Sequence, residues 1–486
     1  MAYKIGDRMQ QTFLPNSIDK YVSEADPVRV YDAFVDALDF AQLGIPIEPF
    51  KAGADTYYPK QMVKLIVYGY SYGLRSSRKL ERACQHNLSF IWLMGGLTPA
   101  YRTIARFRDQ HKNAIKQILK QSVHMCIKLD LIDGNTLFID GSVFKANAAL
   151  SKTWDHERCE KALTKINEHI DKLVDEIQRL DRDEQDQGSI TEVKEHLRDQ
   201  EQRKQKVEAI VAELNQRQSE CSKDQTASYN TTDPESIKIH KSHKTSQGYS
   251  VQLAVDKKHG LIVHCESTDA HTDAGQLNPQ IEQAAQTLEH KPQTVCSDTG
   301  YYSLKELAKV DSTVTVVVPN QKQVLKERYG KTPMPFDKEN FQYDPEHDQY
   351  ICPADKRLHP VGIDQNKQTM AYRAHVADCL TCVHHPDCCS SSRRGRTIKR
   401  SLHESLKEQL QATYDSPEGQ KIYRLRKEKA ELPFGHFKRN LAAERFLLKS
   451  KAGTNAEASL LSIVFNITRM ITLIGVPQLV SSLRGT

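Results

Sequence analysis

Two short apolar runs, each followed directly by an aspartate, constrain the fold of this chain most strongly. In residues 136–147 the run Thr-Leu-Phe-Ile ends at Asp140, and in residues 294–302 the run Thr-Val-Cys-Ser ends at Asp298. Glycine or other small residues follow each acid. A β-prone run that stops at an acid in this way is typical of a buried strand reaching the edge of a sheet. The sequence therefore predicts two strands that bring Asp140 and Asp298 to a sheet edge.

Two such carboxylates are suited to binding divalent cations. Carboxylate oxygens are preferred ligands of Mg²⁺, and Mn²⁺ accepts the same ligands. Two ions about 4 Å apart can hold the attacking and leaving oxygens of an in-line phosphoryl transfer. We therefore expect two Mg²⁺ (or Mn²⁺) ions and a third carboxylate.

The third acid is expected on a basic, helix-prone stretch over residues 420–441. On a continuous helix Arg424, Lys427 and Lys438 share a face with Glu431. The alternative is a solvent-exposed helix with ordinary charge pairs. Pro433 should kink or restart this helix, so Glu428 remains a second candidate.

Composition indicates a polar globular protein of two to four domains, with 486 residues and 38% hydrophobic residues. The net charge of +6 is mild, so DNA binding has to be inferred from basic clusters at 102–108, 393–400 and 421–429. Polar residues interrupt the late apolar run 460–476, which predicts a buried helix and a soluble protein without a membrane partner. Eleven cysteines without a signal peptide indicate reduced, cytoplasmic thiols.

The fold class expected from these patterns is α/β, a ribonuclease H-like domain with two insertions after an all-α N-terminal domain. Residues 1–130 are predicted to form this helical domain, which binds DNA through Arg102, Arg106 and Arg108 or is a scaffold with a charged surface. Residues 131–150 and 225–320 should form the sheet, with a hairpin over 249–268, a helix from Asp273 to Leu288, a second helix, and strands at 294–297 and 310–318. Residues 416–486 should add C-terminal helices that complete it.

Apolar residues recur in steps of three and four from Leu163 to Leu180 and again from Ile190 to Leu214, where Gln200 and Lys204 occupy two of the positions. This heptad spacing predicts an antiparallel coiled-coil hairpin inserted over residues 151–224. We expect it to be structural or to contact a partner chain.

Residues 321–415 are predicted to be a cysteine-rich insertion. Cys379 and Cys382 have the spacing of a zinc knuckle, and Cys352 with Cys388 or Cys389 could supply the other thiolates of a Zn²⁺ site. His375, His384 and His385 are alternative ligands. Free thiols explain the pattern equally well.

Taken together, several motifs give the chain a resemblance to the DDE transposases of bacterial insertion sequences. These motifs span nearly its whole length: Tyr58-Pro59, residues 68–78, Thr103-Ile-Ala-Arg-Phe-Arg108, Phe138-Ile-Asp-Gly141, Lys145-Ala-Asn147, Gly248-Tyr-Ser-Val-Gln252, Ser297-Asp-Thr-Gly-Tyr-Tyr302, and Glu431-Leu-Pro-Phe-Gly435 with Lys438. The resemblance implies that Asp140, Asp298 and Glu431 form a metal-binding triad. Related enzymes carry a Tyr, Arg, Glu, Lys signature. In this chain Lys438 fits its spacing, whereas Arg424 and Lys427 stand in the Tyr and Arg places.

The resemblance further implies cleavage at the ends of an insertion sequence and strand transfer into target DNA. The expected partners are the terminal inverted repeats, the target DNA and a second copy of the chain, because both ends of the element must be paired. The expected location is the bacterial cytoplasm, at the nucleoid. Two alternatives are a ribonuclease H-like nuclease without strand transfer and a catalytically silent DNA-binding repressor derived from a transposase.

Overall fold

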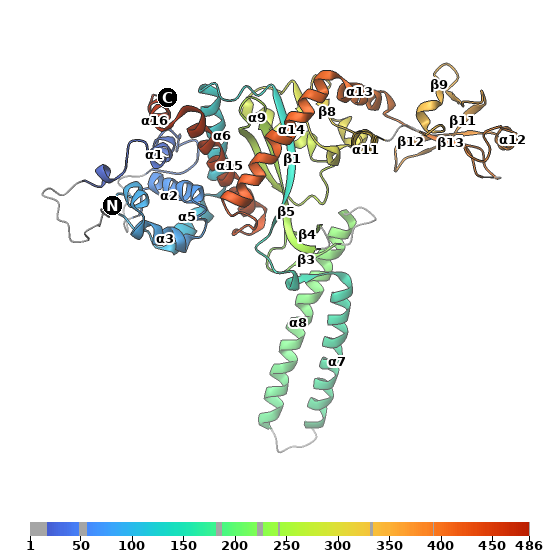
Figure 1. Cartoon of the computed structure of the whole chain (residues 1–486). Coiled ribbons are helices and arrows are strands. Elements are labelled where there is room, and N and C mark those ends of the chain that lie inside the picture. Colours follow the sequence, from blue (N-terminus) through green and yellow to red (C-terminus); the bar gives the residue numbers. More distant parts are fainter. Residues whose placement is uncertain are drawn as a thin grey trace, which may run out of the picture.

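A computed structural model describes residues 17–47, 56–180, 187–220, 227–241, 244–330, 334–391 and 393–485. At its centre is a mixed sheet in the order β4-β5-β1-β7-β8, with β6 also paired to β5 (Figure 1). β1 is antiparallel to β5 and parallel to β7, and β7 is parallel to β8. The strands are β1 (Thr136–Lys145), β4 (Ile237–Lys241), β5 (Lys244–Asp256), β6 (Ile262–Thr268), β7 (Thr294–Cys296) and β8 (Thr315–Val317).

Strand β1 lies between β5 and β7 in the sheet, and its apolar residues are buried. Leu137, Phe138 and Ile139 have no exposed surface. The long helix α14 (Pro417–Gly435) crosses the sheet beside β1 and contacts β1, β5, β7 and β8 (Figure 1). The other helices linking or flanking these strands are α9 (Leu277–Leu288), α10 (Leu304–Leu307), α11 (Gln321–Tyr329) and α13 (Glu404–Asp415).

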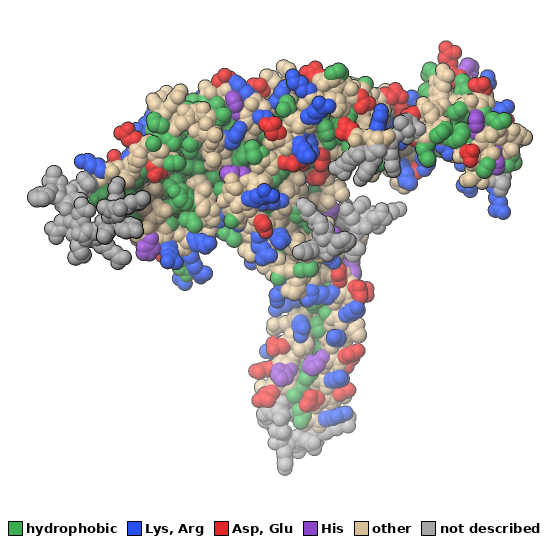
Figure 2. Space-filling model, viewed as in Figure 1, with side chains coloured by type: hydrophobic (Ala, Val, Ile, Leu, Met, Phe, Trp, Pro, Cys, Tyr) green, Lys and Arg blue, Asp and Glu red, His purple; other side chains and the backbone are tan. Residues whose placement is uncertain are grey.

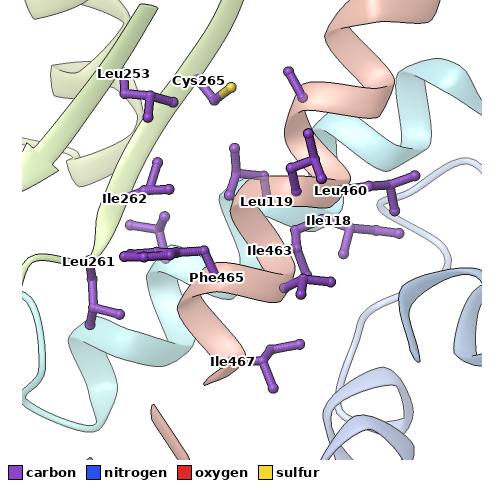
Figure 3. Packing of buried hydrophobic residues seen from close by; sticks show 14 of the residues in the cluster. Ile118, Leu119, Leu253, Leu261, Ile262, Cys265, Leu460, Ile463, Phe465 and Ile467 are labelled. Atoms are coloured by element: carbon purple, nitrogen blue, oxygen red, sulfur yellow. The ribbon is translucent and has the colours of Figure 1, made fainter. Parts of the chain in front are cut away.

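The N-terminal helices share one hydrophobic core with the sheet. They are α1 (Val28–Asp36), α2 (Pro59–Ser71), α3 (Ser77–His86), α4 (Leu88–Leu93), α5 (Tyr101–Gln110) and α6 (Lys112–Lys128). Figure 3 shows Leu119 of α6 close to Phe465 of α15 (Ser450–Ile474) and to Ile262 of β6. A buried ion pair of 2.7 Å between Arg75 and Glu457 also joins the two ends of the chain. The mixed α/β fold and its N-terminal helical region are therefore packed as one body.

Helix α15 is long and apolar enough to cross a membrane by length and composition. Most of it is buried within the protein, where it packs against α2, α6 and β6. Helix α16 (Val476–Arg484) follows it and packs against α1. These contacts account for the apolar run as a core helix.

Two parts project from this body (Figure 1). Helices α7 (His156–Leu180) and α8 (Gln187–Glu220) lie side by side, and β2 (Thr153–Trp154) pairs with β3 (Tyr229–Asn230) at their base. The turn between the helices lies outside the described residues. Cys159, Ile166, Val207 and Leu214 are buried between the helices, and charges of both signs alternate along their outer surface (Figure 2).

The second projecting part is a separate antiparallel sheet in the order β13-β12-β11-β10-β9. Its strands are β9 (Gln342–Asp344), β10 (Gln349–Ile351), β11 (Arg357–Asp364), β12 (Thr369–Ala374) and β13 (Thr397–Ser401), and helix α12 (Val376–Leu380) lies between the last two. Its own small core consists of Phe341, Tyr350, Leu358, Tyr372, Ala374 and Ile398. We call residues 341–401 the cysteine-bearing unit.

Three elements differ from the sequence expectation. The helix expected from Asp273 begins at Leu277, and the strand expected over 310–318 is limited to Thr315–Val317. Helix α14 continues through Pro433 to Gly435 and does not restart there. Because proline has no amide hydrogen, one bond of the helical ladder is lost. A π-helical turn, His436–Asn440, follows directly.

Candidate active site at the ends of β1 and β7

The three candidate acids come from elements that are far apart in the sequence. Asp140 lies within β1, Asp298 follows β7 directly, and Glu431 lies on α14. Because β1 and β7 are paired in parallel from Thr136 with Thr294 to Phe138 with Cys296, both aspartates lie at the same end of the strand pair. Backbone amides orient their carboxylates: Gly141 donates to Asp140 at 2.9 Å and Gly300 donates to Asp298 at 2.8 Å.

The charges of these acids act on one another. Burial, together with the negative charges of Asp298 and Glu431, raises the pKa of Asp140 to about 6, against the lowering effects of Arg426 and of the Gly141 amide. Asp140 is largely buried, with 13% of its side chain exposed, whereas Glu431 is exposed at the surface of α14. The site therefore concentrates negative charge at the sheet edge, where a cation would be favoured.

Arg426 supplies positive charge at this position. Its Nη1 lies 3.4 Å from Asp140 Oδ2, and its guanidinium lies 5.6 Å from the centre of the Tyr423 ring. Its Nε and Nη1 are buried without a hydrogen-bond partner. A buried guanidinium with unsatisfied donors is suited to an anion such as a phosphate group.

The sequence pattern favoured Arg424 and Lys427 rather than Arg426, and both of these side chains are exposed. The buried face of α14 contains Ile422, Ala430 and Phe434, and Arg426 occupies the position between the first two in steps of four. An arginine in the apolar row of an amphipathic helix was the signal that could have identified it.

Lys438 approaches the site from the π-helical turn. Its Nζ donates to Ser142 Oγ at 2.6 Å and lies 4.8 Å from the centre of the Phe144 ring. Beyond it is an open cavity of about 810 Å³ whose lining includes Lys145, Lys438 and Arg445. A negatively charged strand passing along β1 would meet these cations.

The exposed arginines of α5 are Arg102 and Arg106. Arg108 is different: it is 6% exposed, and its Nη1 donates to the carbonyl oxygen of Arg75 at 2.8 Å and to the Tyr70 hydroxyl at 3.3 Å. The hypothesis that Arg108 contacts DNA is not supported, because Arg108 is buried and its Nη1 joins parts of the N-terminal helical region.

The cysteine-bearing unit gathers its thiols around one small cavity. Its lining includes Cys352, Cys379, Cys382, Cys388 and Cys389 together with His384 and His385. Three of the sulfurs accept backbone N–H groups: Cys352 from Lys356 and Cys379 from Arg396 at 3.3 Å, and Cys382 from His384 at 3.5 Å. Burial raises the pKa of the Cys379 and Cys388 thiols, and for Cys379 the N–H group donated by Arg396 opposes this rise.

Among the described residues, no group of three or more His, Cys, Asp or Glu side chains is close enough to hold a metal ion. The donor chemistry nevertheless suits metals at both places. The acids at β1 and β7 offer only carboxylate oxygens, as Mg²⁺ and Mn²⁺ prefer. The cysteine-bearing unit offers thiols and imidazoles, as Zn²⁺ prefers.

Two family models match the chain. A transposase domain (DUF772) matches residues 16–110, and a transposase DDE domain matches residues 351–471. No curated protein and no solved structure shows significant similarity. The fold and the two matches define a transposase, and the chain is a DDE transposase of the insertion-sequence type. This confirms the resemblance found in the sequence. DDE transposase domains are generally ribonuclease H-like and generally use divalent metal ions.

Proposed function

We propose that the protein cleaves DNA at the ends of an insertion sequence and joins the freed ends to target DNA. The observation that supports this proposal is that the charges of Asp298, after β7, and Glu431, on α14, act on the buried Asp140 of β1, although the three residues lie on separate elements. Divalent cations in such a site lower the pKa of a bound water and stabilise charge on the attacking and leaving oxygens. Asp140, Asp298 and Glu431 would hold these cations.

The remaining residues of the site would bind the DNA backbone. Arg426 would contact the phosphate beside Asp140 through its unsatisfied donors, and Lys438 would contact the strand near Ser142. Hydrolysis of a phosphodiester at the element end releases a 3′-hydroxyl. This hydroxyl then gives its proton to solvent and attacks a target phosphorus. A new P–O bond forms, the bond to the target's 3′-oxygen breaks, and that oxygen takes up a proton from solvent. A dimer would bring both ends together.

A labelled oligonucleotide carrying the element's terminal repeat tests the proposal. We expect both cleaved and joined products in Mg²⁺ or Mn²⁺, and neither product from Asp140→Asn or Asp298→Asn. Asp269→Asn is a matched control, because Asp269 is exposed and pairs with Lys451 at 3.1 Å. Hydrolysis without joining would instead indicate a nuclease. DNA binding without cleavage would indicate a repressor, and cleavage by either aspartate variant would refute the proposed site.

We also propose a structural Zn²⁺ ion in the cysteine-bearing unit, held by Cys352, Cys379, Cys382 and Cys388. Its support is the common cavity of these thiols and the N–H groups donated to three of the sulfurs. Its role would be to hold the second sheet together, since only six buried hydrophobic residues form that core. Metal analysis of purified protein tests it: one zinc per chain is expected, and none would refute it.

A further inference from the structure

A fourth carboxylate, Asp273, lies beside the candidate active site. It stands in the segment between β6 and α9, a region that the sequence analysis assigned to the start of a helix. The helix begins four residues later, at Leu277, and its first turn is not capped by Asp273. Its carboxylate is therefore not accounted for by helix capping.

Two glycines show where the two oxygens of Asp273 lie. A Cβ added to Gly141 would be 2.9 Å from Asp273 Oδ1. A Cβ added to Gly300 would be 3.0 Å from Asp298 Oδ1 and 3.5 Å from Asp273 Oδ2. Asp273 Oδ1 therefore lies next to Gly141, the residue after Asp140. Asp273 Oδ2 and Asp298 Oδ1 both lie next to Gly300.

A hydrogen-bond network orients this carboxylate. Gln252, which pairs with Gly141 across β5 and β1, donates from Nε2 to Asp273 Oδ1 at 2.7 Å. The Tyr301 hydroxyl donates to the other end of the same amide, at Gln252 Oε1. Gln252 and Tyr301 are both fully buried. This network fixes Oδ1 and turns Oδ2 toward Asp298.

A second observation at this site concerns Arg426. Its Nη1 forms the 3.4 Å ion pair with Asp140 Oδ2, and neither its Nη1 nor its Nε, both buried, makes a hydrogen bond. Buried donors of this kind are rare in folded proteins unless a bound group satisfies them. A bound anionic group such as a phosphate would satisfy these donors, and Asp273 lies beside the same acids, because the charge of Asp298 acts on it.

We propose that Asp273 is a fourth acidic ligand of this site and that, together with Asp298, it binds one of the two divalent cations. The inference rests on the proposed function, because it assigns a ligand to the same metal centre. Carboxylates on both sides of the space in front of Gly300 supply the hard oxygen donors that such a cation requires. Gln252 is then a positioning residue, since it holds Asp273 without reaching the ion.

Mn²⁺ binding to the full-length protein, measured by electron paramagnetic resonance, tests this assignment without using activity. We expect two bound ions in the wild-type protein. Asp273→Asn keeps the hydrogen-bond acceptor for Gln252 but removes the negative charge. It should lower the affinity for one of the two Mn²⁺ ions about 10-fold or more. Asp269→Asn, in the same segment but exposed, should bind Mn²⁺ as the wild type does. The melting temperature of each variant is measured alongside.

The outcomes separate this inference from the proposed function. A wild-type protein without saturable Mn²⁺ binding overturns the proposed metal centre itself. Wild-type binding of two ions, together with unchanged affinity in Asp273→Asn, overturns only the role of Asp273.

Gly300→Ala is a second variant that keeps every acid and serves if Asp273→Asn fails to fold. Its methyl group would lie in the space shared by Asp273 and Asp298, so Mn²⁺ affinity should fall. Gly275→Ala is its control, because a Cβ there meets nothing within 4 Å. Equal Mn²⁺ affinity in the two alanine variants would contradict the inference.

Discussion

The candidate active site and the cysteine-bearing unit assemble their candidate ligands in opposite ways. The acids Asp140, Asp298 and Glu431 come from β1, β7 and α14 and rest on the large core that joins the sheet to both ends of the chain. The thiols lie within residues 352–389, on a small sheet with six buried hydrophobic residues. The first site is held by the fold, whereas we expect the second to hold its own fold together.

The difference lies in the source of the folding free energy. A large hydrophobic core stabilises by tens of kcal/mol of apolar burial and can tolerate repelling carboxylates. A core of six side chains stabilises far less, so ligand bonds to a metal become part of the folding free energy. The following experiments test this contrast.

Removal of zinc should have the largest effect and should be confined to the cysteine-bearing unit. Structural zinc contributes about 10 kcal/mol or more in small domains. A strong chelator, or Cys379→Ser, should therefore expose residues 341–401 to protease while the rest of the chain stays protected. Cys84→Ala is the control, since Cys84 is buried among the N-terminal helices. If the cysteine-bearing unit resists protease equally with and without zinc, its fold does not depend on the metal, and the proposed difference between the two sites is wrong.

Loss of the third acid should lower DNA cleavage strongly but leave the fold unchanged. Glu431→Gln should lower DNA cleavage by about 10²–10³-fold, as expected for lost transition-state stabilisation. Glu428→Gln should change it less than about twofold, because Glu428 is 71% exposed and lies 3.8 Å from Lys429. Melting curves of both variants should match the wild type. A loss of cleavage in Glu428→Gln alone would transfer the role to Glu428.

The cost of burying the acids should be measurable as a pH dependence without divalent cations. Burial raises the pKa of Asp140 to about 6, whereas the unfolded value is about 3.9. The folded protein then binds the proton more tightly, so its stability falls as pH rises from about 4 to about 6. The Asp140→Asn side chain stays neutral at every pH. The free energy of unfolding of this variant should therefore exceed that of the wild type by about 2–3 kcal/mol at pH 7 and equal it at pH 4. Denaturant unfolding at the two pH values decides this.

The smallest effect is expected at the exposed arginines of α5. Arg102→Ala and Arg106→Ala should each weaken DNA binding a few-fold and lower the salt dependence of the affinity by about one ion. Arg108→Ala should instead lower stability by about 1–3 kcal/mol, because it leaves buried partners without a donor. Unchanged salt dependence in the first two variants would exclude α5 from the DNA interface.

The sequence predicted most of the elements because their signals are local. Apolar runs gave β1 and β7, and the transposase resemblance was confirmed by the family matches. Heptad spacing predicted long helices where α7 and α8 lie. The domain boundaries and the roles of the site residues stay predictions.

What only the tertiary structure decided is which charged side chains face the acids. The sequence alone determined that a strand leads to each of Asp140 and Asp298, since the signal for a strand lies in neighbouring residues, although β1 continues past Asp140 to Lys145. It could not select Arg426 over Arg424, because the buried face of α14 is defined by its contact with β1. It also could not identify Asp273, whose neighbours Gln252, Gly141 and Asp298 lie on other elements. Charge and burial at a site are properties of the folded surroundings, and these come from residues distant in the chain.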